Sequence, residues 1–218
     1  MSSPFFEQEK LIIVGNKNLS YGAICEIIGF KAKTNVFLFD FFNSKKKLLK
    51  NSFVEKVNLK YIFPNKICLE IKERKPECYI KYLNDAYILI DNNLCVLEIT
   101  KSKEKRVPIF TGLDFDSFYL GEKLALKNKY VLDYVIKLSD NIIKDNFVAY
   151  DFVVDLKNKN DIHVYIKNID ILLGNIDNCN YKIALLKSIL NSGSKYLEKP
   201  GILNLKEKDQ TPVFKFIT

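Results

Sequence analysis

The sequence has little of what most catalytic sites are built from. It contains no tryptophan and a single histidine, His163. A Ser-His-Asp or Cys-His arrangement would have to use His163, which lies in the alternating run DIHVYIK and is expected to be a solvent-facing strand residue. Neither a GxGxxG nor a GxxxxGK[ST] phosphate-binding loop is present. These absences favour a binding or scaffold protein over an enzyme.

The cysteines form no metal or redox motif. The chain has five, and no two of them are arranged as CxxC: Cys25, Cys68, Cys78, Cys95 and Cys179. An odd number cannot be fully paired within one chain. Most of the five lie in apolar runs, where a reduced cysteine packs as a small core residue. We therefore predict reduced, structural thiols, which favours a reducing environment, and we predict no metal or cofactor.

The chain also lacks a long hydrophobic run. No apolar stretch approaches the ~18–20 residues that span a bilayer, and no signal peptide is visible. The net charge is +8, carried mainly by lysine, and basic chains often meet phosphates or anionic surfaces. The densest run, Lys45-Lys46-Lys47, lies between apolar residues as on the outer face of a helix. A solvated lysine surface is the simpler interpretation; nucleic-acid binding stays an alternative, although no glycine-aromatic motif accompanies the lysines.

What the chain does contain is enough for a packed core. Its 218 residues are 48% hydrophobic and 28% charged, which argues against global disorder and fits one large domain or two small ones. Many short runs of Ile, Val, Phe and Tyr favour a strand-rich fold.

The first part of the chain is predicted to be strand, helix, helix, strand, strand. An apolar strand ends at the turn signal Gly15-Asn16. Ser20 and Asp40 can each cap a helix. In the second of these helices, Leu48 and Leu49 are expected to face inward and the lysines outward.

The last two strands of this part are predicted to form a hairpin. In NLKYIFPNKICLEIKERKP, residues 58–76, apolar residues alternate on both sides of a turn at Pro64-Asn65. Pro76 cannot donate to a central ladder, so it fits a boundary. We therefore place a domain boundary between residues 1–75 and 76–218.

The second part is predicted to be mainly β. Asp91-Asn92-Asn93 is the expected turn between two of its first strands. A long amphipathic helix is expected over residues 131–143, and a shorter helix over NYKIALLKSILNSG, ending at Gly193. The expected strands are ECYIKYL, AYILID, LCVLEIT, VPIFTG, a meander of FVAYDFVVDL, DIHVYIK and IDILLG, and the closing pair GILNLKE and TPVFKFI.

In their order and spacing, these segments resemble the extracytoplasmic region of the FtsQ/DivIB cell-division family over nearly the whole chain. LIIVGNKNLSYGAI, NVFLFD and VEKVNLKYIFPNKICLEIKERKP resemble a POTRA domain as that family carries it. AYILIDNNLCVLE and VPIFTG match the middle of the family's second domain, and its end is matched by IDILLGNIDNCNYKIALLKSIL and GILNLKEKDQTPVFKF.

The resemblance implies an α+β protein. An N-terminal POTRA domain (β-α-α-β-β) would occupy residues 1–75, and a mixed, mainly antiparallel β-sheet domain with flanking helices would occupy residues 76–218. The resemblance also implies a non-enzymatic division protein, held in the cell membrane by one upstream helix with these domains outside the membrane at the septum. It would bind small coiled-coil partners of the FtsB/DivIC and FtsL type, help control septal peptidoglycan synthesis, and offer its POTRA domain to other divisome components.

Partner binding is predicted at the C-terminal strands. If one of them lies at a sheet edge, its N–H and C=O groups can accept a partner strand. Lys206 and Lys215 would discourage indiscriminate pairing. The candidate residues are Ile202, Leu203, Asn204, Leu205, Lys206, Pro212, Val213, Phe214, Lys215 and Phe216. The alternative is that these strands only close the sheet.

Two features depart from the family pattern. Five cysteines are unusual outside the membrane, a conflict that an anaerobic host would remove. Where the family often has Asp-Leu-Arg, this chain has Asn204-Leu205-Lys206, so a salt bridge at this place would differ. A POTRA-bearing chaperone or secretion component that binds unfolded strands stays open as a second class of function.

Overall fold

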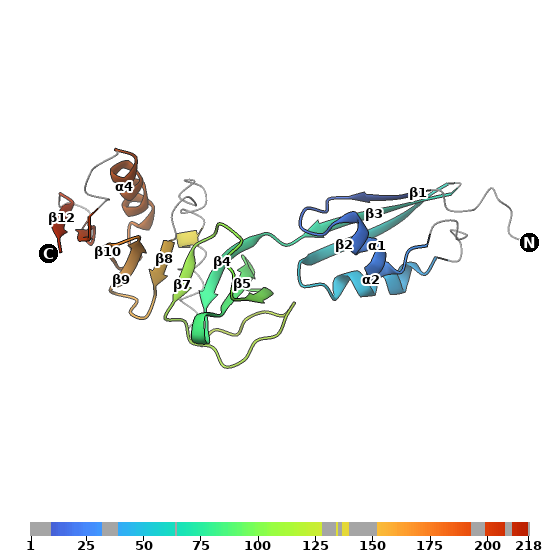
Figure 1. Cartoon of the computed structure of the whole chain (residues 1–218), viewed down its shortest axis with the longest axis horizontal. Coiled ribbons are helices and arrows are strands. Elements are labelled where there is room, and N and C mark those ends of the chain that lie inside the picture. The colour runs from blue at the N-terminus through green and yellow to red at the C-terminus, as the bar shows by residue number, and fades with distance from the viewer. Residues whose placement is uncertain are drawn as a thin grey trace, which may run out of the picture. The chain divides into compact units, whose positions relative to one another are not determined.

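The chain divides into two compact units, Met1–Lys75 and Pro76–Thr218 (Figure 1). The computed structural model describes residues 10–31, 39–63, 65–127, 134, 137–139, 152–192, 199–207 and 211–217.

The N-terminal unit is a three-stranded sheet covered by two helices. Its elements are β1 (Lys10–Val14), α1 (Tyr21–Ile28), α2 (Phe41–Leu49), β2 (Val54–Ile62) and β3 (Lys66–Glu73). The sheet order is β1-β3-β2, with β1 parallel and β2 antiparallel to β3. The predicted order of strand, helix, helix, strand, strand is confirmed.

Helix caps and cross-strand pairs explain where the helices of this unit begin and how its strands align. Ser20 Oγ accepts a hydrogen bond from Ala23 N at 3.2 Å. Asp40 Oδ1 accepts one from Asn43 N at 2.8 Å, so both predicted caps are confirmed. The apolar faces of β2 and β3 coincide in the hairpin register, and with α1 and α2 they form one core of Leu11, Ile24, Ile28, Leu48, Val54, Val57, Ile67, Leu69 and Ile71.

One expectation for α2 is wrong. Leu48 is buried, but Leu49, expected to face inward, is 44% exposed. Successive residues of a helix point about 100° apart, and the inner face of α2 is already taken by Phe41, Ser44 and Leu48. Leu49 therefore joins Phe42 on the outer face.

A carboxylate that the sequence did not single out holds the turn after β1. Glu73 accepts hydrogen bonds from the backbone N of Lys17 at 2.9 Å, of Asn18 at 2.7 Å and of Leu19 at 3.0 Å. Partial burial raises the pKa of Glu73, but these backbone N–H groups outweigh it and hold the pKa below its ordinary value. The turn also needs Gly15, which has φ +89° and whose added Cβ would lie 2.2 Å from a β3 carbonyl oxygen.

The C-terminal unit is built on a nine-stranded sheet. Its order is β12-β11-β10-β9-β8-β7-β4-β5-β6, and five of the eight neighbouring pairs are antiparallel while three are parallel. The predicted mixed, mainly antiparallel sheet is confirmed. The elements are β4 (Pro76–Lys81), the short 3₁₀-helix η3 (Leu83–Asp85), β5 (Tyr87–Asp91), β6 (Val96–Thr100), β7 (Ile109–Thr111), β8 (Phe152–Asp155), β9 (Ile162–Ile166), β10 (Ile169–Gly174), α4 (Cys179–Asn191), β11 (Gly201–Asn204) and β12 (Val213–Phe216).

The connections between β8, β9, β10 and β11 set the positions of these strands in the sheet. The expected meander is confirmed as β8, β9 and β10, which pair antiparallel in sequence order. Parallel neighbours need a crossover, and α4 provides it between β10 and β11.

Of the long helix expected over 131–143, the structure describes residues 134 and 137–139, which are helical. The other predictions that lie outside the described residues are residues 131–133, 135–136 and 140–143 of that helix, the link over 32–38, the turn residue Pro64, strand residues 147–151 and the helix stop at Gly193.

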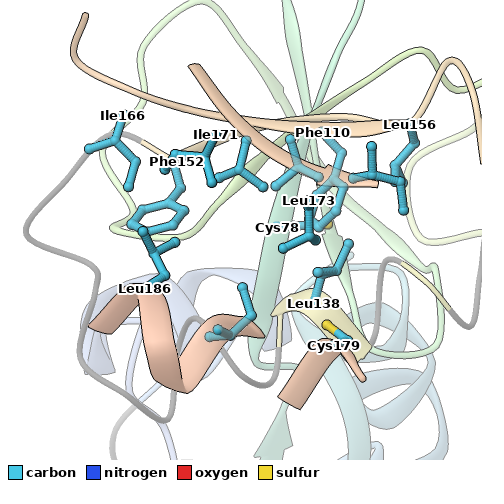
Figure 2. Close-up of a cluster of buried hydrophobic side chains, with 14 of the residues drawn as sticks. Cys78, Phe110, Leu138, Phe152, Leu156, Ile166, Ile171, Leu173, Cys179 and Leu186 are labelled. Atoms are coloured by element: carbon cyan, nitrogen blue, oxygen red, sulfur yellow. The ribbon is translucent and has the colours of Figure 1, made fainter. Parts of the chain in front are cut away.

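Part of the core of the C-terminal unit lies between the sheet and α4. Figure 2 shows Phe152, Ile171 and Leu173 of the strands directed toward the side on which α4 presents Leu186. Cys78 and Cys179 are buried in the same cluster. Burial raises the pKa of the Cys78 thiol and raises that of Cys179 to about 11, so both groups remain neutral thiols at physiological pH.

Candidate functional site

The lone histidine belongs to a surface network. His163 lies on β9 between the buried residues Ile162 and Val164, so it faces the solvent side of the sheet, where neighbours cover most of it. Its Nδ1 lies 2.8 Å from Asp170 Oδ1 and its Nε2 lies 3.6 Å from Asp161 Oδ2. Within the described part of the chain, no group of three or more His, Cys, Asp or Glu side chains could hold a metal.

The structure separates the two C-terminal strands. β11 lies between β10 and β12, and among the described strands β12 is the last in the sheet order. Leu203 and Leu205 are each 3% exposed and belong to the core, so their side chains do not offer a surface to a partner. Among the ten predicted residues, the exposed positions of β12 are Val213, Lys215 and Phe216.

The direction of the main-chain groups along β12 follows from one hydrogen bond. Ile217 N donates to Pro200 O at 3.1 Å, so this residue faces β11. Main-chain groups alternate in direction along an antiparallel ladder. Lys215, two residues earlier, therefore also faces β11, while the N–H and C=O groups of Phe214 and Phe216 point to the outer side of the sheet.

The main-chain groups of β11 are directed into the sheet. Gly201 N donates to Asn168 O at 3.3 Å, and Leu205 N donates to Leu172 O at 2.9 Å. By the same alternation, the N–H of Leu203 also faces β10. A proline at either leucine would therefore disrupt the sheet itself instead of testing its edge.

Gly201 leaves space for the Phe214 ring of β12 to pack against the backbone of β11. A Cβ on Gly201 would lie 2.2 Å from Phe214 Cζ, so the ring packs directly over the β11 backbone. The rings of Phe214 and Phe216 meet edge to face with centroids 5.1 Å apart, and Lys199 Nζ lies 5.8 Å from the centroid of Phe216. Phe216 is nevertheless 52% exposed.

The opposite face of this strand is also accessible. Val213 is 50% exposed and Ile217 is 54% exposed, with the exposed Lys215 between them. We define the β12 edge as residues Val213–Phe216 together with Ile217. It combines outward main-chain groups, exposed apolar side chains on both faces and one lysine, which is a surface suited to an additional strand.

Lys206 is engaged within the chain. Its Nζ lies 2.6 Å from Asp161 Oδ1, and its backbone N donates to Asn204 Oδ1 at 3.0 Å. The hydrogen bond from Lys206 is the main reason that the pKa of Asp161 lies below its ordinary value. In Asn204-Leu205-Lys206, the lysine thus makes an ion pair while the asparagine holds the turn.

A buried lysine supports the same region and was missed by the sequence reasoning. Lys182 of α4 is 2% exposed, and its Nζ donates to Leu173 O at 2.8 Å and to Asn175 O at 3.2 Å. Burial lowers the pKa of its ammonium group. Lys182 joins α4 to the end of β10, and no periodicity in the sequence distinguishes it from the surface lysines.

Known proteins match both the first unit and most of the whole chain. Residues 6–74 match the model of the POTRA domain, FtsQ-type. A protein named Cell division protein DivIB from Clostridium botulinum (strain Hall) is 28% identical over 216 residues, which are 97% of this chain and 82% of that relative. The protein of the same name from Clostridium tetani is 26% identical, over 97% of this chain and 80% of the relative. Cell division protein FtsQ from Syntrophotalea carbinolica is 21% identical over 155 residues, 71% of this chain and 54% of the relative.

Over most of its length, the chain is similar to proteins of the FtsQ/DivIB family. This similarity confirms the resemblance seen in the sequence, and the match over residues 6–74 confirms the POTRA fold expected for the N-terminal unit. The names of the relatives support a role in cell division. In the part of the chain that the structure describes, no helix has the length and apolar character required to cross a bilayer.

Proposed function

We propose that this FtsQ/DivIB-family chain is a non-enzymatic scaffold of the division machinery that binds a partner by strand addition at the β12 edge. The partner chemistry is that of the small coiled-coil division proteins of the FtsB/DivIC and FtsL type. The observation that carries the proposal is that β12 ends the sheet order among the described residues, with exposed apolar side chains on both of its faces.

The side chains of the edge would give such a contact its selectivity. A partner strand along β12 would meet apolar groups on both faces, Phe216 on one and Val213 and Ile217 on the other. Lys215 favours an acidic residue on the incoming strand. Affinity would come from the backbone ladder, and register would come from the side chains.

The cellular setting of the proposal follows the family. The two units would lie on the extracytoplasmic side of the membrane at the septum, held there by one helix that precedes this sequence. Through its coiled-coil partners, the protein would help control septal peptidoglycan synthesis. A fluorescent fusion of the complete gene product should collect at division sites, and an even distribution around the cell would contradict this setting.

The binding site is tested with a pair of substitutions at one position. Phe216→Pro removes an outward N–H and the ring, whereas Phe216→Ala removes the ring and keeps the N–H. We expect Phe216→Pro to weaken binding of the FtsB/DivIC-like protein at least about tenfold more than Phe216→Ala, because one ladder hydrogen bond is lost and its acceptor is left unsatisfied. Calorimetric titration of the purified proteins gives both dissociation constants.

Folding must be separated from binding in this test. Both variants should keep the circular dichroism spectrum of the parent and lose less than about 1 kcal/mol of stability in urea, because Phe216 is half exposed on the last strand. Equal affinities of the two folded variants would contradict strand addition at β12. If both affinities were also lower than that of the parent, the contact would be made by the Phe216 ring and not by the backbone ladder.

We also propose that residues 1–75 and 76–218 are separate folding domains. Each unit has its own buried cluster, which supports this division. Residues 1–75 expressed alone should unfold cooperatively in urea, and limited proteolysis of the whole chain should cut near Pro76 first. A fragment that stays unfolded under native conditions would show that the boundary is misplaced.

A further inference from the structure

Helix α2 of the N-terminal unit carries an outer face that its packing does not use. Phe42, Lys45, Lys46, Leu49 and Lys50 recur at positions i, i+3, i+4, i+7 and i+8, the spacing of one face of a helix. All five are exposed, with Phe42 at 80% and Leu49 at 44%. We call these five residues the α2 outer face.

The order of side chains around this face is that of a helix at a membrane surface. At about 100° per residue, Phe42 and Leu49 share the centre of the face, with Lys45 on one side and Lys46 and Lys50 on the other. Lysines can extend their ammonium groups past an apolar centre into the headgroup layer while aromatic and leucine side chains enter the acyl boundary.

The charge of the segment has one sign. Residues 41–50 contain four lysines and no acidic residue. Asp40, which precedes them, directs its carboxylate to the backbone of Asn43 as the helix cap. A lysine close to an anionic bilayer contributes about 1 kcal/mol to binding, so three of them are enough to select an anionic surface over a neutral one.

We propose that the α2 outer face docks the N-terminal unit onto the surface of an anionic phospholipid bilayer, with Phe42 inserted at the headgroup boundary. The helix is already folded, because Leu48 and Ser44 on its inner face are buried in the unit, so docking requires no ordering of the chain. The exposed phenyl ring favours a bilayer over a soluble polyanion, which has no apolar layer to receive it. This inference goes beyond the partner binding proposed above and does not depend on it.

Two matched triple substitutions test the electrostatic part. Replacing Lys45, Lys46 and Lys50 by Glu changes the net charge from +8 to +2 (8 − 6 = 2). The control replaces Lys17, Lys56 and Lys66 by Glu, which are exposed lysines elsewhere on the same unit, and reaches the same net charge. With the whole chain and vesicles of phosphatidylglycerol and phosphatidylcholine, we expect the α2 triple to lower the partition coefficient at least about a hundredfold and the control less than about fivefold.

The apolar part is tested at a single position. Phe42→Ala keeps the net charge and should lower partition into the same vesicles about tenfold. The chain contains no tryptophan, so Phe42→Trp places one indole at the proposed insertion point. Its emission should move to shorter wavelength with anionic vesicles, stay unchanged with phosphatidylcholine alone, and be quenched by brominated acyl chains.

Three results would overturn the proposal. Equal losses in the two triple variants would mean that binding follows net charge and not the α2 outer face. An unchanged indole emission of the Phe42→Trp variant on bound vesicles would exclude insertion. Unchanged vesicle binding by Phe42→Ala, together with binding of soluble polyphosphate or of an acidic peptide that competes with vesicles, would assign the lysines to a different class of ligand.

Discussion

The two ends of the nine-stranded sheet are treated differently by the chain. At β6, the loop 119–124 supplies partners of its own: Val96 N donates to Glu122 O at 2.9 Å, Gly121 N donates to Val96 O at 2.8 Å, and Cys95 bridges Lys123. At β12, the last strand in the sheet order pairs with β11 and carries half-exposed apolar residues on both faces. The start of β6 is therefore paired with a loop of the chain itself, whereas β12 ends the sheet order among the described residues.

This difference shows that the accessibility of an edge strand depends on which other segments of the chain pair with it. Both ends are short strands with apolar and charged residues, and their compositions do not tell them apart. Hydrogen bonds from loop 119–124 protect the start of β6 from unintended pairing, whereas β12 is the edge at which we propose that a partner strand is added. Four predictions test this contrast, from the largest expected effect to the smallest.

The largest effect is expected inside the sheet, next to the edge. Leu203→Pro removes an N–H directed at β10 and a leucine that is 3% exposed, so it should destabilise the C-terminal unit by about 3 kcal/mol or more. Phe216→Pro, on the outer side of β12, should cost less than about 1 kcal/mol. Urea unfolding followed by circular dichroism measures both, and similar losses would mean that the direction of the main-chain groups is assigned wrongly.

The attachment of β12 to the sheet depends on a glycine. Gly201→Ala places a Cβ where the Phe214 ring now packs and should cost about 2 kcal/mol through overpacking. The matched control is Gly22→Ala in α1, where an added Cβ meets nothing within 4 Å and a gain of about 0.5–1 kcal/mol is expected. Adding Phe214→Leu to Gly201→Ala should restore part of the loss, and no restoration would exclude the ring as its cause.

The covered end of the sheet depends on the turn that leads into β6. Asp91 Oδ1 accepts hydrogen bonds from the backbone N of Asn93 and of Cys95, each at 2.8 Å, and Asp91 is 2% exposed. Asp91→Ala leaves these donors without that acceptor and should cost about 1–2 kcal/mol. Asn92→Ala at the exposed neighbouring position should stay within about 0.5 kcal/mol, and thermal unfolding of the two variants provides the comparison.

The smallest effect is expected at the ion pair beside the C-terminal strands. The hydrogen bond from Lys206 holds the pKa of Asp161 below its ordinary value, so Lys206→Met should raise that pKa, which carboxyl NMR can follow. The contribution of a carboxylate with a lowered pKa is present above its unfolded-state pKa and is lost as the pH falls through the folded pKa. Both groups are accessible to solvent, so the effect on stability should be small. An Asp161 pKa that does not move in the variant would contradict the pairing.

Periodicity and caps predicted the elements well. Alternation in β2 and β3, the meander of β8 to β10, and the caps Ser20 and Asp40 all rest on contacts between residues close in sequence. Such local patterns are readable because a strand repeats every two residues and a helix about every 3.6. The Asp91 turn belongs to the same class, since its carboxylate bonds backbone groups two and four residues away.

Expectations about which side chains face inward were less reliable. Leu49 was expected in the core together with Leu48. Successive helix residues point about 100° apart, so only Leu48 lies on the inner face with Phe41 and Ser44. Glu73 and Lys182 were not singled out, because their partners are backbone groups on other turns, which sequence does not show. The α2 outer face emerges only when the buried side of that helix is known.

The amino-acid sequence by itself determined the order of elements, and it predicted the family resemblance and the C-terminal region as the candidate site. Only the tertiary structure decided that β11 is an interior strand and β12 is the edge. The two strands are alike in length and pattern, and they differ in what lies beside them. β11 pairs on one side with β10, which becomes its neighbour only after α4 has returned the chain across the sheet. That neighbour is set by long-range packing, and no pattern within residues 201–217 contains it.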